Sequence, residues 1–437
     1  MEKLKVLFVL RSHANPRAYE SIVAALQKRG HEVIIPKKGG KFRLKLRRDI
    51  WRHPLLASRQ LLSYRSYFFM KQSSYFRDRW VIFFPEGLRK LVAIPGANFL
   101  IKSRLGGWLL SAVERIAPPD KGALSQLREI EPDIIVSAVA NMRYKSSETD
   151  YIKAAKSLGI PTAYVVLSWD NLTIKGKMHI LPEVLLVWNS VQINEAWEHH
   201  GMPKEKIKLV GSTVFDHWFK GRSEKSSREE FCRKHGMDHA NPIFTYLGSS
   251  ANIAKDETAV VLKLKKSLEE SPDKKARSAQ MIFRPHQANT EIYEKFPEGN
   301  GIFHFPKGRI KDPVETERLY YDTLIHSDFV LGINTSAMLE AIILDKPVVS
   351  YLADEFKKTQ SDAQHFQELI AENTIEIAES PQEFAKIAAT LFAGVDNMRG
   401  QRKHFIKKFI RPNGSDTSAG EYAAYEIEKL AVTHLQS

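Results

Sequence analysis

A short polar turn between an apolar strand and a helix is the strongest chemical signal in this sequence. The apolar run 329–331 is followed by Gly-Ile-Asn-Thr-Ser, and the next residues predict a helix. Free N–H groups at a helix start, with hydroxyl groups beside them, form a favourable place for a phosphate. Asn334, Thr335 and Ser336 are therefore candidate ligands, and Glu340 lies one turn deeper, where it would reach a ribose hydroxyl or an amino group. The alternative is an ordinary helix cap beside a solvated glutamate.

Two more segments in the same half of the chain end apolar runs in a similar way. Arg284 and His286 come directly after such a run, and this pair would hold a diphosphate by charge and hydrogen bonds. Gly248 and Ser249 follow the run 242–247, and a turn of small residues lets a backbone approach a phosphate closely. Each segment also fits a plain polar turn, so its meaning depends on where the strands bring it.

The first half of the chain offers two candidate bases. His13 follows the apolar run 4–10, and an imidazole can take a proton from a hydroxyl group near neutral pH. Asp170 follows another strand-like run and is a rival base or an acceptor ligand. Trp169 beside it would stack on a sugar ring or, more commonly for a tryptophan, belong to the core. The alternative for His13 is an inert surface histidine.

The sequence carries no signature of a metal centre or of a bound cofactor. There is no Walker A loop and no GxGxxG motif. The histidines at 199, 200, 235 and 239 have no carboxylates at useful spacing, so we interpret them as surface residues. The single cysteine, Cys232, excludes a disulfide framework and a cysteine zinc cage. We expect no metal and no cofactor.

Alternating strands and helices position these candidates. Six apolar runs predict strands in the first half, at 4–10, 31–36, 132–137, 162–167, 183–188 and 207–210. Five do so in the second half, at 242–247, 281–284, 302–305, 329–332 and 347–351. Short buried strands separated by helices are typical of parallel sheets, so the fold class is α/β with two Rossmann-like domains. Ligands of such sheets bind beyond the carboxyl ends of the strands, where the candidates lie.

We place the first domain at 1–218, the second at 219–396, and C-terminal helices at 397–437 that would cross back to the first domain. Residues 37–119 interrupt the alternation with interleaved aromatic and basic residues, and we interpret them as an insertion of amphipathic helices. The net charge of +14 favours anionic partners such as phosphates or acidic lipids, with solvation of a large surface as the alternative. No motif supports nucleic-acid binding.

No apolar stretch reaches the roughly 18 residues that a membrane-spanning helix needs, and the N-terminus does not resemble a signal peptide. We therefore expect a cytoplasmic protein. Residues 37–115 would dock it on an anionic membrane face; alternatively, the aromatic residues of this segment pack into the domain core.

Several segments resemble glycosyltransferases of the GT-B type. The His-Ala-Asn-Pro loop at 13–16 and Arg-Gly-His-Glu-Val at 29–33 are similar to the start of these enzymes. Residues 187–216 and the closing 409–415 resemble CDP-glycerol glycerophosphotransferases and related capsule and lipopolysaccharide transferases. The plant-type donor signature is absent, and the glycine-rich loop is reduced to Gly248-Ser249-Ser250.

The resemblance implies two domains facing each other across a cleft, the first on the acceptor side and the second binding a nucleotide sugar. It implies that His13 is the base and that Arg284, His286, Thr335, Ser336 and Glu340 hold the donor. The expected protein is a metal-independent glycosyltransferase that acts on a lipid-linked or polysaccharide acceptor of the cell surface. A non-hydrolysing sugar-nucleotide 2-epimerase and a GT-B binding module without turnover are the alternatives. The donor base, and retention or inversion at the anomeric carbon, stay open.

Overall fold

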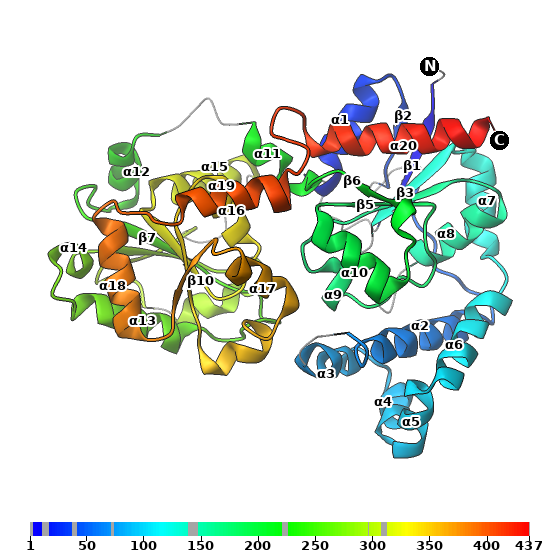
Figure 1. The fold of residues 1–437 in the computed structure, drawn as a ribbon, viewed down its shortest axis with the longest axis horizontal. Coiled ribbons are helices and arrows are strands. Elements are labelled where there is room, and N and C mark those ends of the chain that lie inside the picture. Colours follow the sequence, from blue (N-terminus) through cyan, green and yellow to red (C-terminus); the bar gives the residue numbers. More distant parts are fainter. Residues whose placement is uncertain are drawn as a thin grey trace. The chain divides into compact units, whose positions relative to one another are not determined.

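The chain forms two compact α/β units, each built on one parallel sheet (Figure 1). The computed structural model describes residues 3–10, 17–36, 42–70, 74–138, 147–220, 226–295, 297–306 and 313–436. Unit 1 comprises Met1–His217 and Lys407–Ser437, and unit 2 comprises Trp218–Ile406. The short helix α11 (Asp216–Phe219) lies where the first passes into the second.

The sheet of unit 1 has the strand order β2-β1-β3-β4-β5-β6, and all its pairings are parallel. Its strands are β1 (Lys5–Val9), β2 (Glu32–Ile34), β3 (Ile134–Ala138), β4 (Thr162–Val165), β5 (Val184–Val187) and β6 (Ile207–Leu209). The helices around it are α1 (Arg17–Lys28), α7 (Lys121–Ile130), α8 (Glu148–Ser157), α9 (Asn171–Ile174), α10 (Ser190–His200) and α20 (Ala419–Leu435). All six strands expected from the apolar runs are present, because strands covered on both faces must be apolar along their whole length.

The C-terminal helix α20 belongs to unit 1, where it packs on α1. Gly420 makes the close approach possible, since a Cβ at that position would lie 2.5 Å from the backbone of Ser21. The buried carboxylate of Asp216 accepts the N–H groups of Ala419 and Gly420, at 3.1 and 2.8 Å, and pairs with Arg411 at 2.7 Å. The start of α20 is thereby fixed to the end of the first strand–helix block.

Among the described residues, five helices form the insertion that precedes α7 between β2 and β3. They are α2 (Arg52–Ser66), α3 (Ser74–Ile82), α4 (Glu86–Ala93), α5 (Pro95–Lys102) and α6 (Arg104–Ile116). Four of the aromatic residues in α2, α3 and the turn between them are buried, namely Tyr64, Tyr67, Phe76 and Trp80. For these residues the core interpretation is the one that the structure shows. Arg59 is also buried, because it pairs with Glu114 at 2.7 Å and Asp150 at 2.9 Å.

The sheet of unit 2 has the order β12-β11-β10-β7-β8-β9 and is also parallel throughout. Its strands are β7 (Ile243–Leu247), β8 (Gln280–Arg284), β9 (Ile302–His304), β10 (Phe329–Gly332), β11 (Val348–Tyr351) and β12 (Glu376–Ala378). Its helices are α12 (Arg228–His235), α13 (Thr258–Glu269), α14 (Lys274–Arg277), α15 (Pro313–His326), α16 (Ala337–Ile343), α17 (Gln364–Ala371), α18 (Pro381–Phe392) and α19 (Arg399–Phe405). Strand β12 was not predicted, because its three residues begin with a glutamate and give no apolar run.

The chain order reverses between β7 and β10 in unit 2. In unit 1 it reverses between β1 and β3. Such reversals open a crevice at the carboxyl ends of the two strands concerned, and ligands of open parallel sheets bind there.

Candidate functional site

The three candidate segments of unit 2 end three neighbouring strands. Gly248 follows β7, Arg284 ends β8 and Asn334 follows β10, and these strands are adjacent in the order β10-β7-β8. The segments are separated by 36 or more residues in sequence, yet parallel pairing brings them to one edge of the sheet. They flank the strand reversal, so the sequence-derived candidates fall where the topology favours a ligand.

Hydrogen bonds from buried side chains fix the turn after β10. The Asn334 side chain is buried; its Nδ2 atom donates to the Thr359 carbonyl at 2.7 Å and lies 3.1 Å from Nε2 of His365. Gln360 donates from Nε2 to the Ile333 carbonyl at 3.0 Å. In the structure Asn334 therefore positions the turn, and its role as a ligand stays a prediction.

The two hydroxyl residues of this turn differ in exposure. Thr335 is buried, and its Oγ1 accepts the N–H of Ala337 at 3.4 Å. Ser336 is exposed, and its side chain makes no capping hydrogen bond to α16. The interpretation of Ser336 as a helix cap is thus not what the structure shows, and its hydroxyl faces the surface of the unit.

Arg284 and Glu340 share an aromatic neighbour that the sequence analysis did not single out. The Arg284 guanidinium lies over the ring of Tyr320, 4.4 Å from its centroid, and the Tyr320 hydroxyl donates to the Glu340 carboxylate. Trp218 packs edge-on against the same ring at 5.7 Å. Burial raises the pKa of Tyr320 far above its ordinary value, so it acts as a neutral donor. An aromatic residue within a helix gives no chemical signal in a sequence, so only the fold reveals this positioning residue.

The turn after β7 is fixed by a close backbone approach and a buried acid. A Cβ on Gly248 would lie 3.1 Å from the Pro285 Cα, so a larger residue would push the turns after β7 and β8 slightly apart. The Glu257 carboxylate accepts the N–H of Ser249 at 2.9 Å. Glu257 is fully buried, and this burial raises the pKa of its carboxyl group.

His286 is partly exposed beside this turn. Its Nδ1 atom accepts the N–H of Ala288 at 3.0 Å, which leaves the proton of the neutral ring on Nε2. Burial lowers the pKa of this imidazole, so the ring is neutral at pH 7 and can donate from Nε2.

In unit 1, Asp170 lies beyond the carboxyl end of β4 at the start of α9, and it pairs with Lys175 at 3.0 Å. Trp169 is buried, which is the core role expected of most tryptophans. His13 lies outside the residues that the structure describes, so its role as base stays a prediction.

One interpretation of the sequence is wrong. His200 is not a surface residue, since it is only 4% exposed. Its Nδ1 accepts the N–H of Met178 at 3.0 Å and its Nε2 lies 2.8 Å from the Leu172 carbonyl. Burial lowers its pKa to about 4, so it is a neutral structural residue. Among the described residues, no group of three or more His, Cys, Asp or Glu side chains is arranged to hold a metal ion.

No protein-family model matches the chain, and no curated protein matches its sequence. Its fold, however, is similar to that of many solved structures. A Staphylococcus aureus MnaA–UDP structure aligns with a TM-score of 0.56 at 11% identity, over 100% of this chain and 98% of the other. A putative UDP-N-acetylglucosamine 2-epimerase from Listeria monocytogenes gives 0.56 at 11%, over 100% and 97%. The glycosyltransferase of kitacinnamycin gives 0.51 at 10%, over 99% and 100%. Together with the two parallel sheets, these whole-chain matches show that the protein has the GT-B fold.

Proposed function

We propose that the protein is a glycosyltransferase that takes a sugar from a nucleotide-activated donor bound to unit 2. The observation that carries this proposal is the meeting of the segments at Gly248, Arg284 and Ser336 on the adjacent strands β7, β8 and β10. A backbone turn of small residues, a guanidinium and an exposed hydroxyl at one sheet edge are the groups that a diphosphate needs.

The roles of the individual side chains follow from their chemistry. Arg284 neutralises the charge of the donor phosphates, which grows on the leaving group as the glycosidic bond breaks. Neutral His286 donates a hydrogen bond from Nε2. Glu340, oriented by the Tyr320 hydroxyl, accepts from a ribose hydroxyl or an amino group of the donor.

The acceptor half of the reaction is assigned to unit 1. His13 is the proposed base that takes the proton of the acceptor hydroxyl in an inverting transfer, and Asp170 is the second choice. We further propose that the acceptor is a lipid-linked or polysaccharide substrate of the cell surface and that the enzyme works at the inner face of the membrane. The amphipathic insertion α2–α6 supports this part.

A sugar-nucleotide 2-epimerase is a second candidate. One specific observation favours it, namely that several proteins of similar fold are UDP-N-acetylglucosamine 2-epimerases by name, including those from Listeria monocytogenes and Methanocaldococcus jannaschii. The two reactions share a donor site and differ in what happens to the sugar, so the donor site alone does not separate them.

A two-step experiment tests the proposal. A thermal-shift panel of UDP-, CDP-, CMP- and GDP-sugars first identifies the nucleotide. The bound sugar nucleotide is then incubated with enzyme in D₂O, with and without a membrane extract as acceptor, and followed by NMR. A transferase releases free nucleotide only when acceptor is present. An epimerase exchanges the hydrogen at C2, so deuterium enters at C2 and the product recovered is still a sugar nucleotide. Stabilisation by a nucleotide without either reaction would favour a binding module.

A further inference from the structure

The outermost helices of the insertion expose an apolar surface. Ten of the seventeen exposed large apolar side chains of the described chain fall within 82–116. They are Ile82, Phe83, Leu91, Ile94, Phe99, Leu100, Leu105, Trp108, Leu109 and Ile116. Exposed apolar residues scattered singly are normal, but so many within one short segment indicate a surface that binds a partner or a membrane.

Helix α6 shows that this exposure is organised. Its inner face packs on α2, where Ser58 donates to the Leu110 carbonyl at 2.6 Å and Arg59 pairs with Glu114 at 2.7 Å. The Arg65 side chain of α2 also lies against Gly107 of α6. The polar side of the helix is therefore turned toward the protein.

The outer face of α6 carries Leu105, Trp108, Leu109 and Ile116, which are 59%, 58%, 45% and 70% exposed. Positions i, i+3, i+4 and i+11 lie on one side of a helix. A globular helix normally turns such a stripe toward the core, whereas α6 turns it toward solvent. The neighbouring α5 adds Phe99, which is 77% exposed.

The charges around this surface are mostly positive. Arg89, Lys90, Arg104 and Arg115 are exposed within 82–116, and Glu86 is the one exposed carboxylate of that range. Glu114 is engaged by Arg59 and Lys153 on the inner face. A surface that combines large apolar side chains with cations is complementary to an anionic lipid headgroup layer.

We propose that α4, α5 and the outer face of α6 insert into the headgroup region of an anionic membrane. The described helices include none that is long and apolar enough to cross a bilayer. The attachment is therefore interfacial, with Phe99, Leu105 and Trp108 below the headgroups and the cations among them. Figure 1 shows α4 and α5 beyond α2 and α6 on the side of unit 1 away from its strands.

The same insertion touches the candidate acceptor edge. The Tyr67 hydroxyl accepts the N–H of Gly176 at 3.0 Å, and Ser63 Oγ accepts that of Lys177 at 3.3 Å. These contacts join α2 and the turn after it to the chain just beyond Asp170 and α9. Docking would thus hold the carboxyl edge of the unit 1 sheet near the lipid surface. This consequence rests on the proposed function, whereas the docking itself does not.

Sedimentation with liposomes tests the docking. We expect binding to vesicles of phosphatidylglycerol and phosphatidylcholine, little binding to phosphatidylcholine alone, and a decrease with salt. Trp108→Ser should weaken binding about tenfold, because a large apolar side chain is lost from the lipid. Arg104→Glu should weaken it by at least about fivefold, the equivalent of one cation near an anionic surface.

The chain offers a close control. Trp197 is 50% exposed on α10 and has Lys204 over its ring, as Trp108 has Arg115. Trp197→Ser should therefore leave lipid binding unchanged, and Lys403→Glu on α19 controls for the charge reversal. Circular dichroism and thermal melting of each variant verify folding.

Three results would overturn the inference: equal binding to neutral and anionic vesicles, no binding to either, or a dimer without lipid that Trp108→Ser converts to a monomer. The last would assign the surface to a second copy of the chain. Binding of the soluble nucleotide, measured on the same variants, reports separately on the donor site, so failure of the docking and failure of the proposed function are distinguishable.

Discussion

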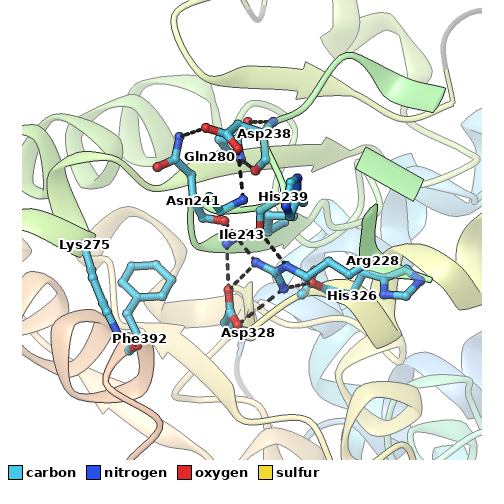
Figure 2. A network of polar contacts seen from close by, with 12 residues as sticks. Arg228, Asp238, His239, Asn241, Ile243, Lys275, Gln280, His326, Asp328 and Phe392 are labelled. Atoms are coloured by element: carbon cyan, nitrogen blue, oxygen red, sulfur yellow. Dashed lines mark hydrogen bonds and ion pairs between the residues drawn. The ribbon is translucent and has the colours of Figure 1, made fainter. Parts of the chain in front are cut away.

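The two edges of the sheet in unit 2 use polar residues in opposite ways. At the amino edge, Figure 2 shows a closed network in which the Arg228 guanidinium donates to the Asp328 carboxylate at 3.1 Å and to the carbonyls of His326 and Asn241 at 2.6 and 3.0 Å. Asp328 also accepts the N–H of Ile243 at 2.7 Å, which ties β7 to the segment that leads into β10. These charges are compensated by the chain itself.

At the carboxyl edge, buried side chains hold the turns from inside and leave the outer groups near solvent. Asn334 and Glu257 bind backbone atoms, whereas Ser336 is exposed and Arg284 and His286 are partly exposed. Polar side chains at the amino edge thus connect the strands to one another. Those at the carboxyl edge fix the turns and leave other polar groups accessible. We therefore predict that substitutions at the first edge act on stability and those at the second, the proposed donor edge, on binding.

The amino edge of the unit 1 sheet follows the same pattern. There Asp133 accepts the N–H of Lys5 at 2.6 Å, and Glu183 accepts that of Thr162 at 2.8 Å. Asp170 lies beyond the carboxyl end of β4 and pairs with Lys175 at 3.0 Å, and His13 is outside the described residues. The comparison therefore yields predictions for both units.

The largest expected effect is on the chemical step. If His13 is the base of an inverting transferase, His13→Ala should lower kcat by roughly 10²- to 10⁴-fold, because the acceptor hydroxyl loses its proton acceptor. Donor affinity should stay normal, and steady-state kinetics with separate calorimetry of the nucleotide measures both. Near-normal turnover would move the assignment to Asp170 or to a retaining mechanism.

Asp328→Ala should destabilise the protein by about 2–3 kcal/mol, because the Arg228 guanidinium and the Ile243 N–H lose a charged acceptor together. Chemical denaturation measures the loss. Adding Arg228→Ala should cost less than the sum of the two single changes, as in a shared network. A change in nucleotide affinity, measured at a temperature where the variant stays folded, would contradict the separate roles proposed for the two edges of the sheet.

Arg284→Ala is the matching change at the other edge. It should weaken nucleotide binding by about 1.5–3 kcal/mol, the usual scale for a charge-assisted contact, with little effect on stability. Arg277, an exposed residue just before the amino end of the same strand β8, is the control, and Arg277→Ala should leave affinity unchanged. Equal nucleotide affinity in both variants would remove the donor site from this edge.

Much of this arrangement follows from the sequence, because buried parallel strands must be apolar and their ends must be polar. The strands that carry Gly248, Arg284 and Asn334 were predictable for that reason. The direction of a side chain was not, since it depends on partners far along the chain. Asn334 turns inward to Thr359, and Tyr320 reaches Glu340 from another helix.

The insertion illustrates the same limit on a larger scale. Its composition predicted amphipathic helices, and helices α2–α6 are present. Aromatic residues such as Tyr64 and Trp80 nevertheless pack inside, while aliphatic residues of α5 and α6 are exposed. Local periodicity gives two faces to a helix, and only the tertiary contacts decide which one is buried.

The smallest expected effect is a pH dependence of nucleotide binding through His286. Burial lowers the pKa of this imidazole, so it is neutral at pH 7 and gains a charge only under more acidic conditions. Protonation places a cation beside the donor phosphates, so affinity for a sugar nucleotide should rise about two- to fivefold as the pH falls through that pKa. The free protein should respond in the opposite sense. An imidazole with a lowered pKa binds its proton more readily in the unfolded chain, so its contribution to stability is lost as the pH drops below about 6.5.

Isothermal calorimetry from pH 7.5 to 5, with His286→Gln as the comparison, measures the binding effect. A sugar diphosphate keeps its charge over this range, so an unchanged pH dependence in His286→Gln would show that another group titrates and that His286 does not face the donor.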